Sequence, residues 1–263
     1  MPLSNELQFH IKIRRADAGG YAILPGNPGR CEKIAAYLEE PEHLGSNREF
    51  NIWRGRLSGE RVLVCSTGIG GPSTAIAVEE LAACGVHTFI RVGTCGGIAP
   101  GVRPGDIVIA SGAVRQDGTS REYAPIEFPA VPDTEVLFAL RESADKLGYT
   151  SHTGVVQSKD SFYGQHSPGK MAVAGQLLAK WEAWKKLGVL ASEMEASTLF
   201  TVSSLLGVSA GAVFHVIWNQ ERAAAGLDKS SDENHDTDRA IKTAVTAVGL
   251  LIKKRAESRP GVN

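Results

Sequence analysis

The strongest constraint on the fold of this chain is a regular alternation of short apolar runs with longer segments of helical spacing. Runs such as "YAILPG" at 21–26 and "RVLVCSTG" at 61–68 have the length of strands, and a helical segment follows each. Strands that alternate with helices favour a mainly parallel sheet with helices on both faces. We therefore predict an α/β fold whose central sheet is mixed, mostly parallel and flanked by helices.

The same pattern gives the expected elements and the domain organisation. Strands are expected at 21–26, 61–68, 87–93, 105–114, 150–158 and 211–219. Helices are expected at 28–40, 72–84, 134–148, 193–207 and 236–258. No repeat or linker interrupts the series, so we predict a single domain over residues 1–263, with loose ends at 1–6 and 259–263.

Composition excludes several classes of function. The chain has 263 residues, 22% of them charged, a formal net charge of -1 and no run of like charge, which argues against nucleic-acid or membrane-surface partners. It contains no apolar run near the roughly 18 to 20 residues that span a membrane, and its first residues lack a signal peptide's apolar region. The cysteines, Cys31, Cys65, Cys84 and Cys95, are scattered without metal-binding spacing. We expect reduced thiols and a cytoplasmic protein.

Glycine-rich turns follow three of the expected strands, in "LPGNPGR", "STGIGGPS" and "RVGTCGGI". Ligands of α/β proteins collect at this end of the strands, and glycine lets the backbone approach an anion closely. A helix N-terminus that follows such a turn adds free N–H groups. The spacing does not match GxGxxG, and no GK[ST] sequence occurs, which argues against NAD and ATP as ligands.

Three arginines lie near these turns. Arg91 is inside an apolar strand, Arg30 follows the first glycine turn, and Arg48 opens "REF". Each could pair with a nearby carboxylate, since a buried cation without a partner is costly. Together they favour a bound phosphate, which guanidinium groups hold by paired hydrogen bonds. Thr94 would add a hydroxyl group.

The segment "SEMEAS" places two carboxylates in apolar surroundings. On a helix, Glu193 and Glu195 would point about 200° apart, so one of them would face the interior. Burial of a carboxylate without partners is costly. The pair could cap a helix or form salt bridges, or the inward acid could bind a ligand.

Seven motifs together carry a resemblance that runs from about Phe9 to the last helix. They are "LPGNPGR", "NREF", "CSTGIGGPSTAIAVEEL", "RVGTCGGI", "APIEFPAV", "DSFYGQ" and "SEMEAS". With them the chain resembles the nucleoside phosphorylase family, and within it the members that act on uridine. The resemblance implies a pentosyltransferase that converts uridine and phosphate, reversibly, to uracil and α-ribose 1-phosphate in pyrimidine salvage. The sequence does not decide whether deoxyuridine or thymidine is also accepted.

The resemblance also implies site residues, partners and an ion. Phosphate, a co-substrate, would contact Gly26, Arg30, Arg91 and Thr94, with Arg48 from a neighbouring subunit. Ribose would contact Met194 and Glu195, with His10 from across a subunit boundary, and the base would face Phe162 and Gln165. No cofactor is required, but a potassium ion is implied between subunits at Glu49, Ile69 and Ser73. Shared sites imply a homo-oligomer, as a dimer-based hexamer.

The base pocket departs from the pattern of the best-known bacterial relatives. Two arginines that would read the uracil carbonyls are replaced by Ser167 and Gln220. Arg222 lies two residues further on and could reach into the pocket if the loop is shaped differently.

Lys159 and His166 are the candidates to replace those arginines. Uracil leaves as an anion, so a positive charge or a proton must reach it. Lysine offers a charge, and histidine can act as an acid near neutral pH. We hypothesise that both stabilise the leaving group; alternatively, Lys159 pairs with Asp160, and His166 is a surface loop residue.

Rival functions remain open at this stage. A purine nucleoside phosphorylase or related nucleosidase would carry an aspartate after the strand "VFHVIWN", where this chain has Gln220. A nucleosidase would not need the arginines that hold phosphate. A non-catalytic nucleoside-binding protein on the same fold would be expected to lose those arginines or Glu195, and all are present.

Overall fold

The computed structural model describes residues 5–258. Nine strands form one sheet in the order β2-β3-β4-β1-β5-β8-β7-β6-β9, and a further pairing of β5 with β9 closes the last five into a ring. The strands are β1 (Tyr21–Pro25), β2 (Glu39–Asn47), β3 (Phe50–Leu57), β4 (Glu60–Cys65), β5 (Thr88–Gly97), β6 (Ile107–Gln116), β7 (Ser151–Lys159), β8 (Ala191–Glu193) and β9 (Ser209–Asn219).

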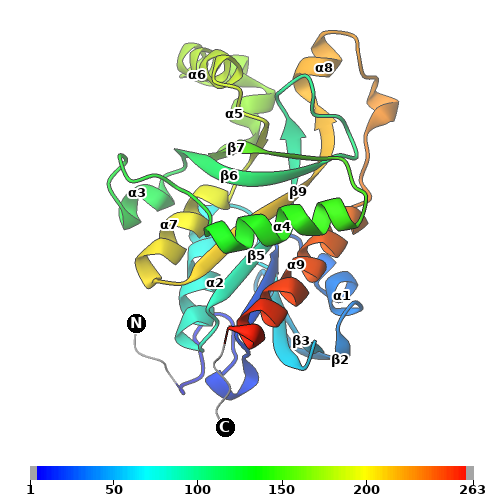
Figure 1. Ribbon diagram of the computed structural model, residues 1–263. Helices are drawn as coiled ribbons and strands as arrows, with labels where there is room; N and C mark the ends of the chain where they lie inside the picture. The colour runs from blue at the N-terminus through cyan, green and yellow to red at the C-terminus, as the bar shows by residue number, and fades with distance from the viewer. Residues whose placement is uncertain (1–4, 259–263) are drawn as a thin grey trace.

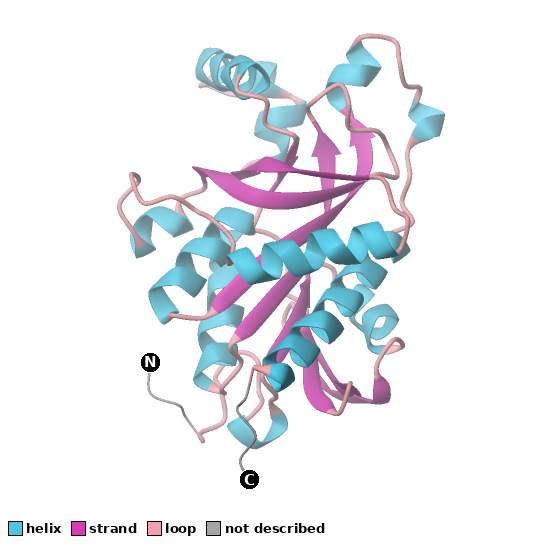
Figure 2. Cartoon of the chain, viewed as in Figure 1, coloured by secondary structure: helices cyan, strands magenta, loops and turns pink. Residues whose placement is uncertain are grey.

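Helices cover both faces of this sheet, as Figures 1 and 2 show. They are α1 (Arg30–Ala35), α2 (Gly71–Ala83), α3 (Thr119–Tyr123), α4 (Thr134–Lys146), α5 (Phe162–His166), α6 (Ala174–Lys186), α7 (Ala196–Leu206), α8 (Gln220–Ala224) and α9 (Asp238–Glu257). Short 3₁₀ turns lie at Arg15–Asp17, Pro168–Lys170 and Ser230–Asp232.

The two faces bury separate apolar clusters. Side chains of α2 and α7, among them Val78 and Phe200, pack on one face of the sheet. Side chains of α1, α4 and α9, among them Ile34, Leu140 and Val248, pack on the other. The strands between them are buried on both sides, which is why their sequences are continuously apolar rather than alternating.

The sheet is mixed. Parallel pairings join β1 to β4 and β5, β5 to β9, and β7 to β6 and β8. Antiparallel pairings join β2 to β3, β3 to β4, β5 to β8 and β6 to β9. The predicted fold class is therefore confirmed: a central mixed, mostly parallel sheet flanked by helices.

Two predicted helices begin or end at the wrong residue. The helix expected at 28–40 ends at Ala35, and residues 39–47 form β2 instead. Pro41 disfavours the helical conformation for the residue before it, and Glu40 has a φ of 50°. The helix expected at 193–207 starts at Ala196, because Glu193 is the last residue of β8. The loose ends expected at 1–6 and 259–263 lie outside the described residues, except for Asn5 and Glu6, which have no regular structure.

Candidate active site

A cavity of about 1120 Å³ lies at the carboxyl ends of β1, β4, β5, β7, β8 and β9. Ligands of open α/β sheets bind at this edge. The cavity brings together most of the residues expected in the site from the sequence. These are Gly26, Arg30, Glu49, Ile69, Arg91, Thr94, Lys159, Phe162, Gln165, His166, Met194 and Glu195.

An ion pair between Arg91 and Glu195 lies in the wall of this cavity. Both side chains are buried, and the Arg91 guanidinium donates to the Glu195 carboxylate. The other Glu195 oxygen accepts from the backbone N–H of Gly70, the N-cap residue of α2, at 2.6 Å. The anion seat expected at the turn "STGIGGPS" is thus taken by the protein's own carboxylate.

Glu193 is buried as well, so the expectation that only one of the two acids faces the interior is wrong. Its carboxylate accepts the backbone N–H groups of Glu195 at 2.8 Å and Ala196 at 3.0 Å. Burial, and then the neighbouring Glu195 carboxylate, raise the pKa of Glu193. Glu193 therefore caps the start of α7, whereas Glu195 lies against Arg91. The segment is not helical at this point, so the helical angle between the two acids does not apply.

Arg30 and Arg91 form a concentration of positive charge beside Gly26 and Thr94. Arg30 donates to the carbonyl oxygen of Val92 at 3.1 Å, and burial, followed by the charge of Arg91, lowers the pKa of Arg30. The Arg91 Nε is buried without a hydrogen-bond partner. A Cβ at Gly26 would lie 3.0 Å from the carbonyl oxygen of Gly68, so a larger residue would crowd this turn. Two guanidinium groups beside a glycine turn suit a phosphate ligand.

Lys159 also lines the cavity, buried at the end of β7. Its ammonium group donates to Ser192 Oγ at 2.7 Å, and Ser192 Oγ donates to Gln165 Oε1 at 2.7 Å. Burial lowers the pKa of Lys159 to about 8. The alternative that Lys159 pairs with Asp160 is not observed, because Asp160 accepts from the backbone N–H of Gly118 at 2.7 Å.

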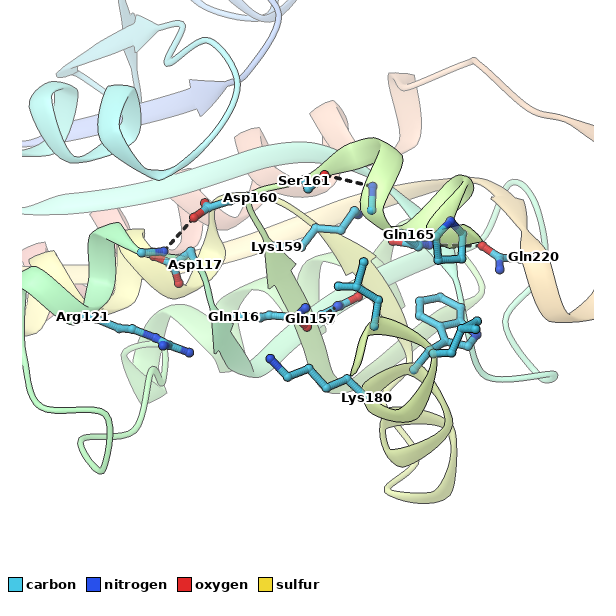
Figure 3. A pocket seen from close by; sticks show the side chains of 16 residues that line it. Gln116, Asp117, Arg121, Gln157, Lys159, Asp160, Ser161, Gln165, Lys180 and Gln220 are labelled. Carbon is cyan, nitrogen blue, oxygen red and sulfur yellow. Dashed lines mark hydrogen bonds between the residues drawn. The ribbon is translucent and has the colours of Figure 1, made fainter. Parts of the chain in front are cut away.

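Lys159 and Gln165 also line a second, smaller cavity of about 340 Å³, shown in Figure 3. Gln116, Gln157, Arg121 and Lys180 lie around it. Lys159 and Gln165 therefore form part of the wall between the two spaces.

Aromatic rings line the part of the large cavity near Lys159. The rings of Phe162 and His166 lie 4.3 Å apart between centroids, and His166 and Trp218 are 6.3 Å apart. Burial, and then the positive charge of Lys159, lower the pKa of His166. A flat heterocyclic base would find apolar surfaces here.

Four expected site residues do not line the large cavity themselves. Arg222 lies outside the cavity. Its guanidinium donates to both carboxylate oxygens of Asp228, at 2.8 and 2.7 Å, and to the carbonyl oxygen of Pro100. The expected reach of Arg222 into the base pocket is therefore not observed. Arg48 is exposed in the turn between β2 and β3. His10 is bound to Glu80 at 2.7 Å. Ser73, which lies in α2, donates its hydroxyl to Glu49 Oε1 at 2.6 Å.

Sequence reasoning missed several lining residues. Ser192 and Cys95 lie on strands, and their chemistry becomes evident only when those strands meet. Glu233 and His235, 3.1 Å apart, reach the cavity from the segment between α8 and α9. No sequence signal links His235 to the site.

Within 5–258, no group of three or more His, Cys, Asp or Glu side chains is placed to hold a metal ion. In the same range, none of the helices has the length and apolar character needed to cross a bilayer.

Comparison with known proteins gives consistent matches over most of the chain. The phosphorylase superfamily matches residues 21–253. A uridine phosphorylase of Treponema pallidum is 52% identical over 249 residues, which cover 95% of this chain and 96% of the relative. A uridine phosphorylase of Escherichia coli is 43% identical, covering 93% and 98%. A guanosine phosphorylase of Halorubrum lacusprofundi is 36% identical, covering 93% and 99%.

Proposed function

The chain belongs to the phosphorylase superfamily, and we propose that it catalyses the reversible phosphorolysis of uridine to uracil and α-ribose 1-phosphate. One observation supports this reaction above all: a single cavity is lined by Arg30 and Arg91, by Glu195 and by Lys159 and Gln165, and in the sheet β8, which leads to Glu195, lies between β5 with Arg91 and β7 with Lys159. The two arginines suit phosphate, and Lys159 and Gln165 suit a base with carbonyl oxygens.

Cleavage of the glycosidic bond builds positive charge on the ribose. Glu195 is buried beside the place proposed for the sugar, and an anion fixed there stabilises that charge. Arg91 and the Gly70 N–H each already donate to this carboxylate. Ribose hydroxyl groups would therefore use its remaining lone pairs.

The departing uracil carries negative charge, and Lys159 is the cation best placed to receive it. Its pKa of about 8 keeps most molecules protonated at neutral pH, whereas the lowered pKa of His166 favours the neutral imidazole. We assign charge stabilisation of the leaving base to Lys159. His166 would contact the base through its ring and one polar nitrogen.

Several further assignments are proposals that follow from the family. Potassium would bind at Glu49, Ile69 and Ser73, where the Ser73 hydroxyl lowers the pKa of the Glu49 carboxyl group and keeps it anionic. Arg48 and His10 would complete the site of a neighbouring subunit in a dimer-based hexamer. We also propose a cytoplasmic location, for which the four free, buried thiols are suited.

The test is to incubate the purified protein with uridine, inosine or guanosine, each with and without phosphate, and to follow release of the free base. We expect release of uracil that depends on phosphate, with little purine released. Release of hypoxanthine or guanine in preference to uracil would overturn the assignment of the base. Release without phosphate would make the protein a nucleosidase.

A further inference from the structure

A buried chain of hydrogen bonds connects three residues that line the cavity. Lys159 ends β7, Ser192 lies in β8, and Gln165 lies in α5. Lys159 Nζ is 2.7 Å from Ser192 Oγ, which is 2.7 Å from Gln165 Oε1. Ser192 is 2% exposed, so water does not supply it with other partners.

The chemistry of the three groups fixes the direction of this chain. An ammonium group has only donors, so the Ser192 oxygen accepts from Lys159. Ser192 has one O–H proton, and Gln165 Oε1 is its acceptor. If the Gln165 amide were turned round, its NH₂ group would face Ser192, and the serine O–H would be buried without an acceptor. Such an unsatisfied group costs about 1–3 kcal/mol.

The fixed amide decides which hydrogen-bonding groups face the base. With its oxygen held by Ser192, Gln165 directs its NH₂ group away, towards Gln220 Oε1 at 3.5 Å (Figure 3). Lys159 uses one N–H on Ser192 and retains two others. Gln165 can then offer a bound base the remaining lone pair of Oε1 and its N–H groups, beside the N–H donors of Lys159. A pyrimidine-2,4-dione matches this pattern, because its N3–H donates to Oε1 and its carbonyl oxygens accept from the N–H groups. A 4-aminopyrimidine such as cytosine has an acceptor at N3 and an amino donor at C4, so it would place acceptor against acceptor and donor against donor.

We propose that Ser192 is a positioning residue that selects the base: by holding the Gln165 amide in one orientation, it makes the site accept uracil-type bases and reject cytosine-type bases. This inference rests on the proposed function and goes beyond it. A site that discriminates through hydrogen bonds rejects a mismatched analogue strongly, because its buried polar groups are left unpaired.

The experiment compares kcat/KM for uridine with kcat/KM for cytidine in the wild type and in Ser192→Ala. Loss of the serine lets the amide turn round, so its oxygen can accept from a cytosine amino group. We expect the uridine value to fall and the uridine-to-cytidine ratio to fall at least about tenfold. Ser192→Thr, which keeps the hydroxyl group, should restore much of the ratio.

Two controls separate positioning from general damage. Ser203→Ala also removes a buried serine hydroxyl, but one without a hydrogen-bond partner and outside the cavity, so it should leave the ratio unchanged. In a Gln165→Ala background, Ser192→Ala should have no further effect on the ratio, since the amide that it positions is gone.

An unchanged ratio in Ser192→Ala, with both substrates slowed equally, would overturn the assignment while leaving the proposed function intact. If Ser192→Ala does not fold, the uridine-to-cytidine ratio is measured in Ser192→Thr and Ser192→Cys instead. A ratio at the wild-type value in both variants, and no change in it when Gln165→Ala is added, would overturn the assignment. A wild type that releases no uracil from uridine would overturn the proposed function itself.

Discussion

At the scale of single residues, the unusual group is Lys159. It is buried beside Glu193 and Glu195 without a direct salt bridge among the described residues, and its hydrogen-bond partner is the neutral Ser192. Burial lowers its pKa from 10.5 to about 8, although the two carboxylates oppose this shift. Perturbed groups of this kind are typical of catalytic sites. The lowered pKa of Lys159 should affect both the rate of the reaction and the stability of the fold.

The pH dependence of uridine cleavage should report the charge on Lys159. We expect kcat/KM to fall as pH rises through about 8, since the protonated form stabilises the departing uracil. The measurement is a pH–rate profile of the wild type, of Lys159→Met and of the exposed control Lys180→Met. Lys159→Met should lose about 10²-fold or more and lack this alkaline fall. If kcat/KM of Lys159→Met still falls as pH rises through about 8, the titrating group is not Lys159.

The same pKa shift should destabilise the fold at neutral pH. The folded state binds the Lys159 proton less tightly than the unfolded state, so the penalty is complete below pH 8 and disappears as pH rises through 10.5. Lys159→Met should therefore unfold at higher urea concentration at pH 7, with a gain on the order of 2–3 kcal/mol, and at pH 10.5 the gain should shrink. Equal gains at both pH values would contradict this account.

At the scale of elements, the segment between β6 and α4 is held by two buried charges. Arg115 at the end of β6 donates to the carbonyl oxygens of Ser120, Ala124, Pro125 and Phe128 at 2.5–2.8 Å. Asp117 accepts from hydroxyl groups of α3 and α7, and these bonds, against the opposing effect of burial, lower its pKa. The Arg115 guanidinium and the Asp117 carboxylate therefore each have hydrogen-bond partners, and they do not form an ion pair with each other.

Removal of the Arg115 guanidinium should leave four carbonyl oxygens without their donor. We expect Arg115→Met to lower the free energy of unfolding by about 3 kcal/mol, measured by urea denaturation, because unsatisfied buried groups are costly. Arg141→Met, on the exposed side of α4, is the matched control and should change stability by less than about 0.5 kcal/mol. A loss of similar size in both variants would show that the carbonyl contacts contribute little.

The sequence predicted the elements whose pattern is local and continuous. The strands buried on both faces, such as β5 and β9, and the long helices α4 and α9 lie close to their expected positions. The edge strand β2 and its neighbour β3 were missed because β2 is irregular: Pro41 lies near its start, and its pairing with β3 has two register shifts. The three-residue β8 is set only by its pairings with β5 and β7, which no local pattern encodes.

In the site, residues adjacent to strand ends were predictable, and contacts between elements were not. Arg91, Thr94 and Lys159 could be placed because each ends or interrupts an apolar run. The roles of Glu193 and Ser192 depend on β8 meeting its neighbours. Arg222 was misplaced, because its pairing with Asp228 in the following loop has no sequence signature.

At the scale of the whole molecule, the cavity of one chain lacks two of its expected contributors. Arg48 is exposed, and His10 is bound to Glu80, and neither lines the cavity. Arg48 lies in the turn between β2 and β3 next to Glu49, which lines the cavity, and the carbonyl oxygen of His10 accepts from Asn47 at the end of β2 at 2.7 Å. This arrangement supports the proposal that a neighbouring subunit completes the site.

A mixing experiment tests that proposal. Arg48→Ala and Glu195→Ala subunits should each be nearly inactive alone, by about 10²-fold or more. If Arg48 acts across a subunit boundary, mixed oligomers will contain some sites with both residues intact, and activity will recover on refolding the two together. Self-mixed samples of each variant are the control. Absence of recovery, with oligomers of mixed composition verified by mass spectrometry, would place Arg48 outside a shared site.

The most direct test of the proposed function follows phosphorus during the reaction. The purified protein is incubated with uridine and inorganic phosphate, and ³¹P NMR is compared with the amount of uracil released. We predict a new sugar phosphate signal, identified as α-ribose 1-phosphate, that grows in equal amount to uracil. Uracil that appears with free ribose while inorganic phosphate remains unchanged would contradict phosphorolysis.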